Sequence, residues 1–242
     1  PLREVPPLSA VDLSPKVSDE DYHRELKKEK KKLQRLHSAL YREKVPVVIG
    51  FEGWDAAGKG GNIRRVAEAL DPRGYEGVPI AAPTADELAH QHLWRFWREL
   101  PKDGHVVLFD RTWYGRVMVE RIEGLTSEVR WRQAYDEINA FEKELSDWGA
   151  VVLKFWLQID PDEQLRRFTT RQETPEKQYK ITDEDWRNRE KWERYEAAVD
   201  EMLQKTSTEY APWVIVESND KKYARLKVLK TVRKALERRL ED

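Results

Sequence analysis

The sequence predicts an α/β fold in which helices cover both faces of a parallel central sheet. Short apolar runs alternate along the chain with longer stretches of helical periodicity, as in βαβ units. The first of these runs leads into a glycine-rich loop, and another helix follows that loop. With 242 residues, of which 39% are hydrophobic, the chain can build one such domain with an appended lid.

Charge and composition exclude several classes of protein. The 44 basic and 45 acidic residues leave a net charge of -1. The chain therefore lacks the overall positive charge typical of nucleic-acid-binding proteins, and we expect no nucleic-acid partner. The absence of cysteine excludes a disulfide scaffold, a zinc–thiolate site and thiol catalysis. No apolar run approaches the length of a membrane span and no signal peptide opens the chain, so we expect a cytoplasmic protein without membrane contact.

The chain opens with a proline-rich segment and a long helix. Residues 1–18 predict an extended N-terminal arm that packs on a neighbour or serves as a linker, and residues 19–242 form the predicted domain. Ser18 offers an N-cap to a helix over 19–43, whose apolar residues recur at helical spacing. The lysine-rich run 27–32 lies mostly on the outer face of this helix. It is either a solvated face or a basic wall beside an anionic substrate.

Strands and helices alternate through the rest of the chain. Buried strands are expected at 46–51, 105–109, 151–157 and 213–216. Helices are expected at about 60–70, 85–99, 116–123, 127–147, 161–206 and 220–241. Pro175 interrupts the charged helical region, so the hairpin at about 161–195 is the predicted lid. Most of the tryptophans are expected in the core, namely Trp94, Trp97, Trp131, Trp148 and Trp156.

Residues 53–61 have the G-x-x-x-x-G-K spacing of a Walker A phosphate-binding loop. Glycines let backbone N–H groups converge on an anion, and the next helix directs its N-terminus to the same place. Lys59 adds a positive charge. Gly60 stands where a Ser or Thr would ligate magnesium, whereas Asp55 lies inside the loop. Asp55 is therefore a candidate metal ligand, with an Asx turn as the alternative.

A second acid follows the strand at 105–109. Asp110 at the carboxyl end of a buried strand, beside a phosphate loop, is the Walker B arrangement, with a strand-end turn as the alternative. Arg111 and Arg116 could grip phosphates, although a surface ion pair is an equal alternative for Arg116. Trp113 and Tyr114 lie near the site in sequence, and one of them could contact a nucleobase.

Basic residues on the predicted lid could face the phosphates, or they could belong to a solvated hairpin: Arg167, Arg171, Lys177 and Lys180. His90 and His92 are two residues apart, so on a helix they diverge and form no metal pair.

Three motifs in order resemble the polyphosphate kinase 2 family. They are residues 53–61, residues 109–114 and Pro175-x-Lys177-x-Tyr179-Lys180, and the resemblance covers roughly 20–240. It implies a P-loop kinase-like three-layer fold, similar to thymidylate kinases, with a parallel central sheet and a helical lid. It also implies Mg²⁺-dependent phosphoryl transfer between inorganic polyphosphate and a nucleotide, with Mn²⁺ as an alternative ion. Tyr179 stands where many members have Trp.

The resemblance also implies roles for individual residues. The catalytic residues would be Asp55, Asp110, Arg111 and Lys59, and the metal would be held by Asp55 and Asp110. The nucleotide would be bound by Asp55, Arg111 and Arg116. The polyphosphate would be bound by Gly58, Lys59, Gly60, Gly61, Arg167, Arg171, Lys177 and Lys180.

The segment 110–124 resembles the AMP-phosphorylating branch. In that resemblance Gly115 stands where diphosphate-using members tend to carry Asn, and members that use both acceptors an acid. The leading hypothesis is reversible transfer from polyphosphate to AMP to give ADP. The alternatives are transfer to ADP or GDP, an ATP-dependent nucleoside monophosphate kinase, and a non-catalytic polyanion- or nucleotide-binding module. Many members of this branch fuse two such domains, and this chain resembles one motif-bearing half. We also expect a homo-oligomer.

Overall fold

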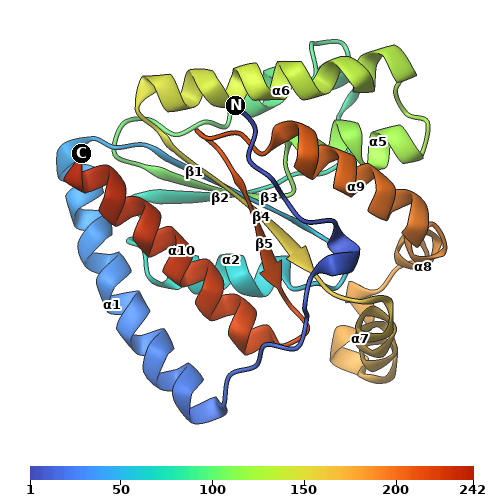
Figure 1. The fold of residues 1–242 in the computed structure, drawn as a ribbon, viewed down its shortest axis with the longest axis horizontal. Helices are drawn as coiled ribbons and strands as arrows, with labels where there is room; N and C mark the ends of the chain where they lie inside the picture. Colours follow the sequence, from blue (N-terminus) through green and yellow to red (C-terminus); the bar gives the residue numbers. More distant parts are fainter.

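A five-stranded parallel sheet forms the centre of the computed structural model, which describes residues 1–242 (Figure 1). The strands lie in the order β2-β3-β1-β4-β5. Their bounds are β1 (Val47–Gly53), β2 (Tyr75–Pro79), β3 (Val106–Asp110), β4 (Val151–Gln158) and β5 (Trp213–Glu217). Since all neighbouring pairs are parallel, all the carboxyl ends meet at one edge. The predicted α/β fold with a parallel central sheet is confirmed.

The strand that we did not expect is β2, at the edge of the sheet. Only Val78 of its residues is buried, and the strand contains Gly77 and ends at Pro79. An edge strand tolerates proline and exposes most of its side chains, so its sequence lacks the apolar run that marks a buried strand. The four strands that were expected are the ones buried inside the sheet or covered by helices.

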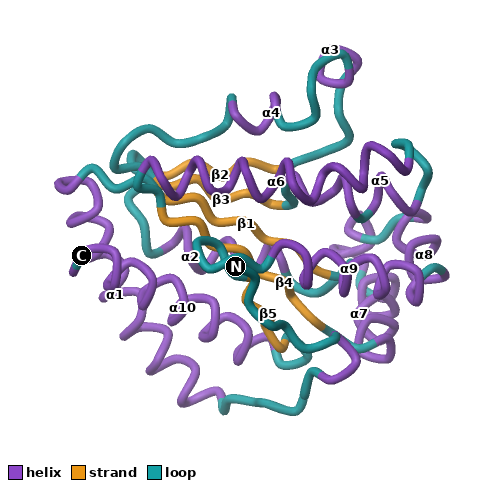
Figure 2. The backbone as a smooth tube through the Cα atoms, turned by 45° about the horizontal axis from the view of Figure 1, so that its top comes forward, coloured by secondary structure: helices purple, strands orange, loops and turns teal.

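Helices cover the two faces of the sheet (Figures 1 and 2). One face carries α1 (Asp19–Glu43), α2 (Lys59–Glu68) and α10 (Lys221–Glu241), and the other carries α6 (Glu128–Trp148) and α9 (Trp192–Thr206). The shorter helices are η1 (Leu8–Ala10), α3 (Ala85–Leu88), α4 (Trp94–Trp97), η2 (Trp113–Val117) and α5 (Val119–Ile122). The helix expected over 85–99 is therefore two short helices. The bounds of α1 agree with the prediction, and the Ser18 hydroxyl caps it by accepting from the Asp21 N–H at 3.1 Å.

The segment predicted as a lid lies beyond the carboxyl ends of the strands (Figure 1). It consists of α7 (Pro161–Glu173), η3 (Pro175–Lys180) and α8 (Asp183–Glu190), and α9 follows directly. Asp160 caps α7, and Pro161 occupies its first position, where no N–H is needed. Pro175 separates α7 from η3, as its sequence position predicted.

The N-terminal arm packs against its own chain. The Leu8 side chain is buried, and its N–H donates to Asp200 Oδ1 on α9 at 2.9 Å. The Arg3 N–H donates to the Ser207 carbonyl at 2.7 Å.

Two tryptophans depart from their expected burial, whereas the lysine-rich run lies mostly outward as predicted. Trp97 and Trp148 are 44% and 48% exposed, so they lie outside the core, where we had expected most of the tryptophans. Glu29 lies inside the lysine-rich run, yet it is buried and pairs with Arg233 of α10 at 2.6 Å. This pair joins α1 to α10. None of the helices combines the length and the apolar character needed to cross a bilayer.

Candidate active site

The phosphate-binding loop joins the end of β1 to the start of α2. Its last residue, Gly58, has φ +105°, a left-handed conformation that glycine adopts without strain. No side chain caps α2, and the N–H groups of its first turn have no acceptors within the helix. These free donors and the positive end of the helix dipole make a site for an anion, with Lys59 beside it.

Close packing and side-chain contacts hold this loop in place. A Cβ on Gly53 would lie 2.8 Å from the Leu157 carbonyl oxygen of β4, so only glycine fits there. Trp54 Nε1 donates to Gln158 Oε1 at 2.8 Å, and Gln164 Nε2 donates to the Asp55 carbonyl at 3.0 Å. The loop is therefore preorganised for its ligand. A Cβ on Gly60 would meet nothing within 4 Å, so the fold has room for a Ser or Thr at this position. Packing therefore does not explain why the magnesium-ligating hydroxyl is missing.

The two predicted metal ligands lie at the same edge of the sheet, Asp55 in the loop after β1 and Asp110 at the end of the neighbouring strand β3. Asp55 accepts from Asn188 Nδ2 of α8 at 3.0 Å and lies 3.7 Å from the Arg111 guanidinium. Asp110 ends β3, which pairs with β1, and its carboxylate forms no hydrogen bond or ion pair within the chain. No group of three acidic or histidine side chains forms a closed metal cage. Two oxygen donors without a cage suit Mg²⁺, which takes one or two carboxylates and completes its shell with substrate phosphates and water.

Arg111 is held in a left-handed backbone conformation, with φ +65°. Its own N–H donates to the Phe51 carbonyl at 3.1 Å, and the next N–H, that of Thr112, donates to Glu52 Oε1 at 2.8 Å. Such a conformation is strained for a residue with a Cβ, so these bonds to β1 maintain it. They direct the Arg111 side chain toward Asp55.

Sequence reasoning missed Glu52. Burial raises the pKa of this carboxyl, and the charges of Lys59 and Arg111 oppose that shift. The Thr112 hydroxyl also donates to it, at 3.0 Å. The signal that could have revealed Glu52 is its position in the sequence. It is a lone acid between the apolar run that ends at Phe51 and the phosphate loop.

A cavity of about 490 Å³ opens beside the phosphate loop. It is lined by the loop, by the segment after β2 and by α5, α8 and α9, and its volume suits a ligand the size of a nucleotide. Lys59, Asp55 and Arg111 stand at its polar end. Its apolar lining includes Ile80, Pro83, Met118, Val119, Leu125 and Trp192. Trp192 stacks on Trp54, with ring centroids 3.6 Å apart, so this wall is aromatic.

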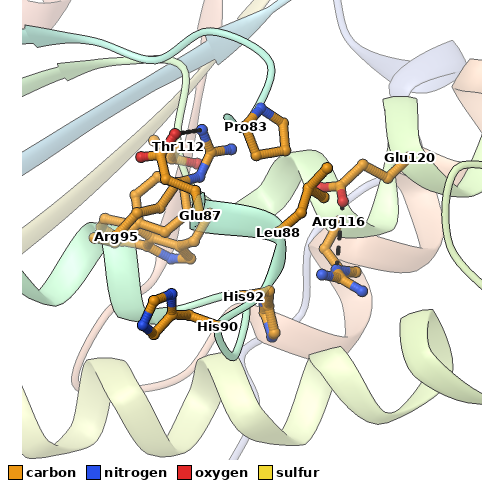
Figure 3. Close-up of a pocket in the computed structure, with 11 residues that line it drawn as sticks. Pro83, Glu87, Leu88, His90, His92, Arg95, Thr112, Arg116 and Glu120 are labelled. Atoms are coloured by element: carbon orange, nitrogen blue, oxygen red, sulfur yellow. Dashed lines mark ion pairs between the residues drawn. The ribbon is translucent and has the colours of Figure 1, made fainter. Parts of the chain in front are cut away.

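Arg116 lies behind this cavity and does not line it. Its guanidinium lies 3.6 Å from Glu120 and donates to the Thr126 hydroxyl at 2.7 Å. Figure 3 shows this ion pair among residues that line a small pocket. The pocket has a volume of about 30 Å³, and His92 also lines it. Glu120 lines both this small pocket and the nucleotide-sized cavity. Its ion pair with Arg116 therefore orients a residue that lines the nucleotide-sized cavity. The ion-pair alternative fits this geometry better than direct contact with a nucleotide phosphate.

Trp113 and Tyr114 are buried, so the expected nucleobase contact was wrong. Both side chains donate to the Glu142 carboxylate of α6, the Trp113 ring at 3.0 Å and the Tyr114 hydroxyl at 2.7 Å. Lys154 of β4 completes this buried cluster by donating to Glu142 at 3.0 Å. The cluster anchors the segment that follows Asp110.

Arg167 differs most from its predicted role. Its side chain is buried and donates to Glu163 and to the Ala56 carbonyl, both at 2.8 Å. It also donates to the Ser218 carbonyl at 2.6 Å and to the Asn219 carbonyl at 3.1 Å. A guanidinium engaged on so many sides has no free edge for a phosphate. Arg167 instead ties α7 to the phosphate loop and to the turn before α10.

The other three lid residues predicted to bind polyphosphate, Arg171, Lys177 and Lys180, form no ion pairs. Arg171 lies near the end of α7, and Lys177 and Lys180 are exposed on η3. The Lys180 ammonium lies 5.9 Å from the ring centroid of Tyr179, which is 78% exposed. These three cations are therefore available to an anion from solvent.

Comparison with known proteins decides the family. Residues 16–242 match the family model described as polyphosphate kinase 2. The chain belongs to the polyphosphate kinase 2 family. A polyphosphate:AMP phosphotransferase of Pseudomonas syringae pv. tomato is 55% identical over 231 residues, which make up 96% of this chain and 46% of that protein.

Two solved structures are also similar to this polyphosphate kinase 2 chain. A polyphosphate kinase 2 candidate from Pseudomonas aeruginosa has a TM-score of 0.94 at 51% identity, covering 97% of this chain and 51% of that one. Polyphosphate kinase 2 from Arthrobacter aurescens has a TM-score of 0.92 at 33% identity, covering 95% and 84% of the two chains. The chain thus spans about half the length of the Pseudomonas proteins that it matches.

Proposed function

We propose that this polyphosphate kinase 2 chain transfers a phosphoryl group reversibly from inorganic polyphosphate to AMP, giving ADP. The observation that carries the proposal is the phosphate loop with Asp55 and Arg111 at the polar end of a nucleotide-sized cavity, next to the end of β3 where Asp110 lies. The high identity to an AMP phosphotransferase supports AMP as the acceptor.

The chain supplies alignment and positive charge to this reaction. The first turn of α2 and Lys59 hold the end of the phosphate donor, and Arg111 holds the acceptor phosphate. Since the acceptor is already an anion, no strong general base is needed, and positioning with charge neutralisation does most of the work. Asp55 and Asp110 would hold Mg²⁺, which would neutralise phosphate charge between the two substrates.

Gly115, which in the resemblance marks the AMP-phosphorylating branch, lines the cavity. A Cβ there would lie 3.8 Å from both Glu120 Oε2 and Val119 Cγ1, which is ordinary contact. A longer side chain would therefore enter the cavity beside Glu120, whereas Gly115 leaves that space open. Transfer to ADP or GDP is the second candidate, and an ATP-dependent monophosphate kinase is the third.

A donor and acceptor panel tests these candidates. The chain is assayed with Mg²⁺, long-chain polyphosphate and each of AMP, ADP and GDP, and then with AMP and ATP. We expect rapid formation of ADP from polyphosphate and AMP. Failure to form ADP from this pair contradicts the proposal, and turnover with ATP alone favours the monophosphate kinase.

The carboxylates are tested by substitution. Asp55→Asn and Asp110→Asn should each lower turnover by about two to three orders of magnitude, as loss of one preorganised electrostatic contact does, while the fold survives. Asp162→Asn, on the exposed first turn of α7, is the matched control. Full activity in either site variant would reject its role as a metal ligand. The cytoplasmic location, the homo-oligomer and the lack of a nucleic-acid partner stay predictions.

A further inference from the structure

The carboxylate of Asp55 is contacted by a residue of the predicted lid that the sequence motifs do not include. Asn188, on α8, donates from Nδ2 to Asp55 Oδ2 at 3.0 Å. The two residues are 133 positions apart in the sequence, so only the folded chain brings them together. Asn188 also lines the nucleotide-sized cavity beside Asp55. An amide from the lid therefore acts on a carboxylate of the phosphate loop.

A neutral donor suits a carboxylate that must also hold a cation. An ionised carboxylate has about four lone-pair positions, so a hydrogen bond to Oδ2 leaves others free. The guanidinium of Arg111 lies 3.7 Å from Asp55 Oδ1, which is beyond hydrogen-bond distance. The Asn188 amide thus fixes the Asp55 carboxylate without neutralising the charge that attracts a divalent ion.

Other contacts hold the backbone around Asp55 but do not reach its carboxylate. Gln164 Nε2 donates to the Asp55 carbonyl at 3.0 Å, and the Trp54 ring stacks on that of Trp192 with centroids 3.6 Å apart. The terminal torsion of an aspartate is broad, so a fixed backbone leaves the carboxylate plane free to turn. The hydrogen bond from Asn188 is the short contact that removes this freedom.

Asn188 is itself held in place by the helix that carries it. α8 begins with a complete capping box, so its first turn is well defined. The next residue, Arg189, donates to the Pro161 carbonyl at 2.7 Å and to Gln164 Oε1 at 3.3 Å. These bonds dock α8 against the start of α7, and the same Gln164 holds the backbone of the phosphate loop. The amide donor and the carboxylate are therefore preorganised as a pair.

We propose that Asn188 is a positioning residue for the metal site, because its amide orients the Asp55 carboxylate and thereby raises the affinity for Mg²⁺. Ligating carboxylates are commonly hydrogen-bonded in turn, and loss of such a partner lowers metal affinity or activity. Asn188 acts through Asp55 and is not itself a metal ligand. This inference rests on the proposed function, since it takes Asp55 as a metal ligand. Because coupling between two equilibria is reciprocal, docking of α8 and metal binding favour each other.

Two substitutions of Asn188 separate a hydrogen-bonding role from a packing role. Asn188→Ala removes the amide and its volume, whereas Asn188→Leu keeps a side chain of similar size without a donor. Glu190→Ala is the matched control, because Glu190 is exposed on the last turn of the same helix. Binding of Mn²⁺ is measured without substrates, from the EPR signal of the free ion, in the unsubstituted chain, in these variants and in Asp55→Asn. Turnover and the KM for AMP are then measured at increasing Mg²⁺.

We expect both Asn188 variants to weaken Mn²⁺ binding by about tenfold, the lower end of the effect of losing a hydrogen-bond partner of a ligating group. Asp55→Asn should weaken it at least as much, and Glu190→Ala should leave it unchanged. Turnover of the Asn188 variants should be low at limiting Mg²⁺ and should recover as Mg²⁺ is raised, with an unchanged KM for AMP at saturating Mg²⁺. A residue that only stabilises the fold would not give such recovery.

Full Mn²⁺ affinity in Asn188→Leu would assign Asn188 a packing role and overturn the proposal. An equal loss in Glu190→Ala, unchanged Mn²⁺ binding in Asp55→Asn, or a defect confined to the KM for AMP would overturn it as well. A chain whose Mn²⁺ binding depends on Asp55 and Asn188 but that forms no ADP would refute the proposed function and leave this assignment standing.

Discussion

Replacing Arg167 by methionine separates a structural role from a substrate-binding role. The guanidinium donates to the carbonyls of Ala56, Ser218 and Asn219 and to the Glu163 carboxylate. Glu163 keeps its pair with Arg166 in the variant, so its charge stays compensated. The carbonyls lose their donor, and each unsatisfied buried acceptor costs about 1–3 kcal/mol.

We therefore expect Arg167→Met to lower the free energy of unfolding by about 3–5 kcal/mol, because three carbonyls lose their donor and two of these contacts are only partly buried. Since domains are stable by about 5–15 kcal/mol, the variant should still fold at low temperature. Urea unfolding followed by tryptophan fluorescence measures the change, with the m-value as a check on two-state behaviour.

Arg171→Met, one turn further along α7, is the control. Arg171 has no ion pair, so its loss should change stability by no more than about 0.5 kcal/mol, as at an ordinary surface position. A loss below about 1 kcal/mol in Arg167→Met would refute the structural reasoning. Unchanged stability with abolished donor binding would restore Arg167 as a direct phosphate ligand.

Two further changes test other parts of the structure. Glu52→Ala removes the acceptor of the Thr112 N–H, so turnover should fall by about tenfold or more as Arg111 loses its fixed position, with a smaller change in KM; unaltered kinetics would contradict this. Lys154→Met leaves the fully buried Glu142 without its cation, and urea unfolding should show a loss of about 3–5 kcal/mol; a neutral result would mean that the acid is uncharged.

The sequence predicted those parts of the fold in which local pattern and tertiary burial agree. The helix over 19–43 has an N-cap at Ser18 and apolar residues at helical spacing from Tyr22 to Leu40, so both of its ends were predictable. The glycine spacing 53–61 likewise located the phosphate loop. The strand β2 was not predicted, because most of its residues are exposed at the edge of the sheet. The hydrophobic pattern of a sequence marks only those strands whose side chains are buried.

The site was predictable in its position and less so in its contacts. Motif spacing located Asp55 and Asp110 at one edge of the sheet, because parallel strands end together. It could not show that Arg167 faces inward, since both a buried and an exposed arginine satisfy a helical pattern.

The uncapped first turn of α2 and the nucleotide-sized cavity both adjoin a single loop, and this bears on the order of events in a catalytic cycle. Two ligands bound at these two places can be present together and can enter or leave independently. Direct transfer within a ternary complex then needs no phosphorylated side chain as an intermediate, and initial-rate plots should intersect instead of running parallel.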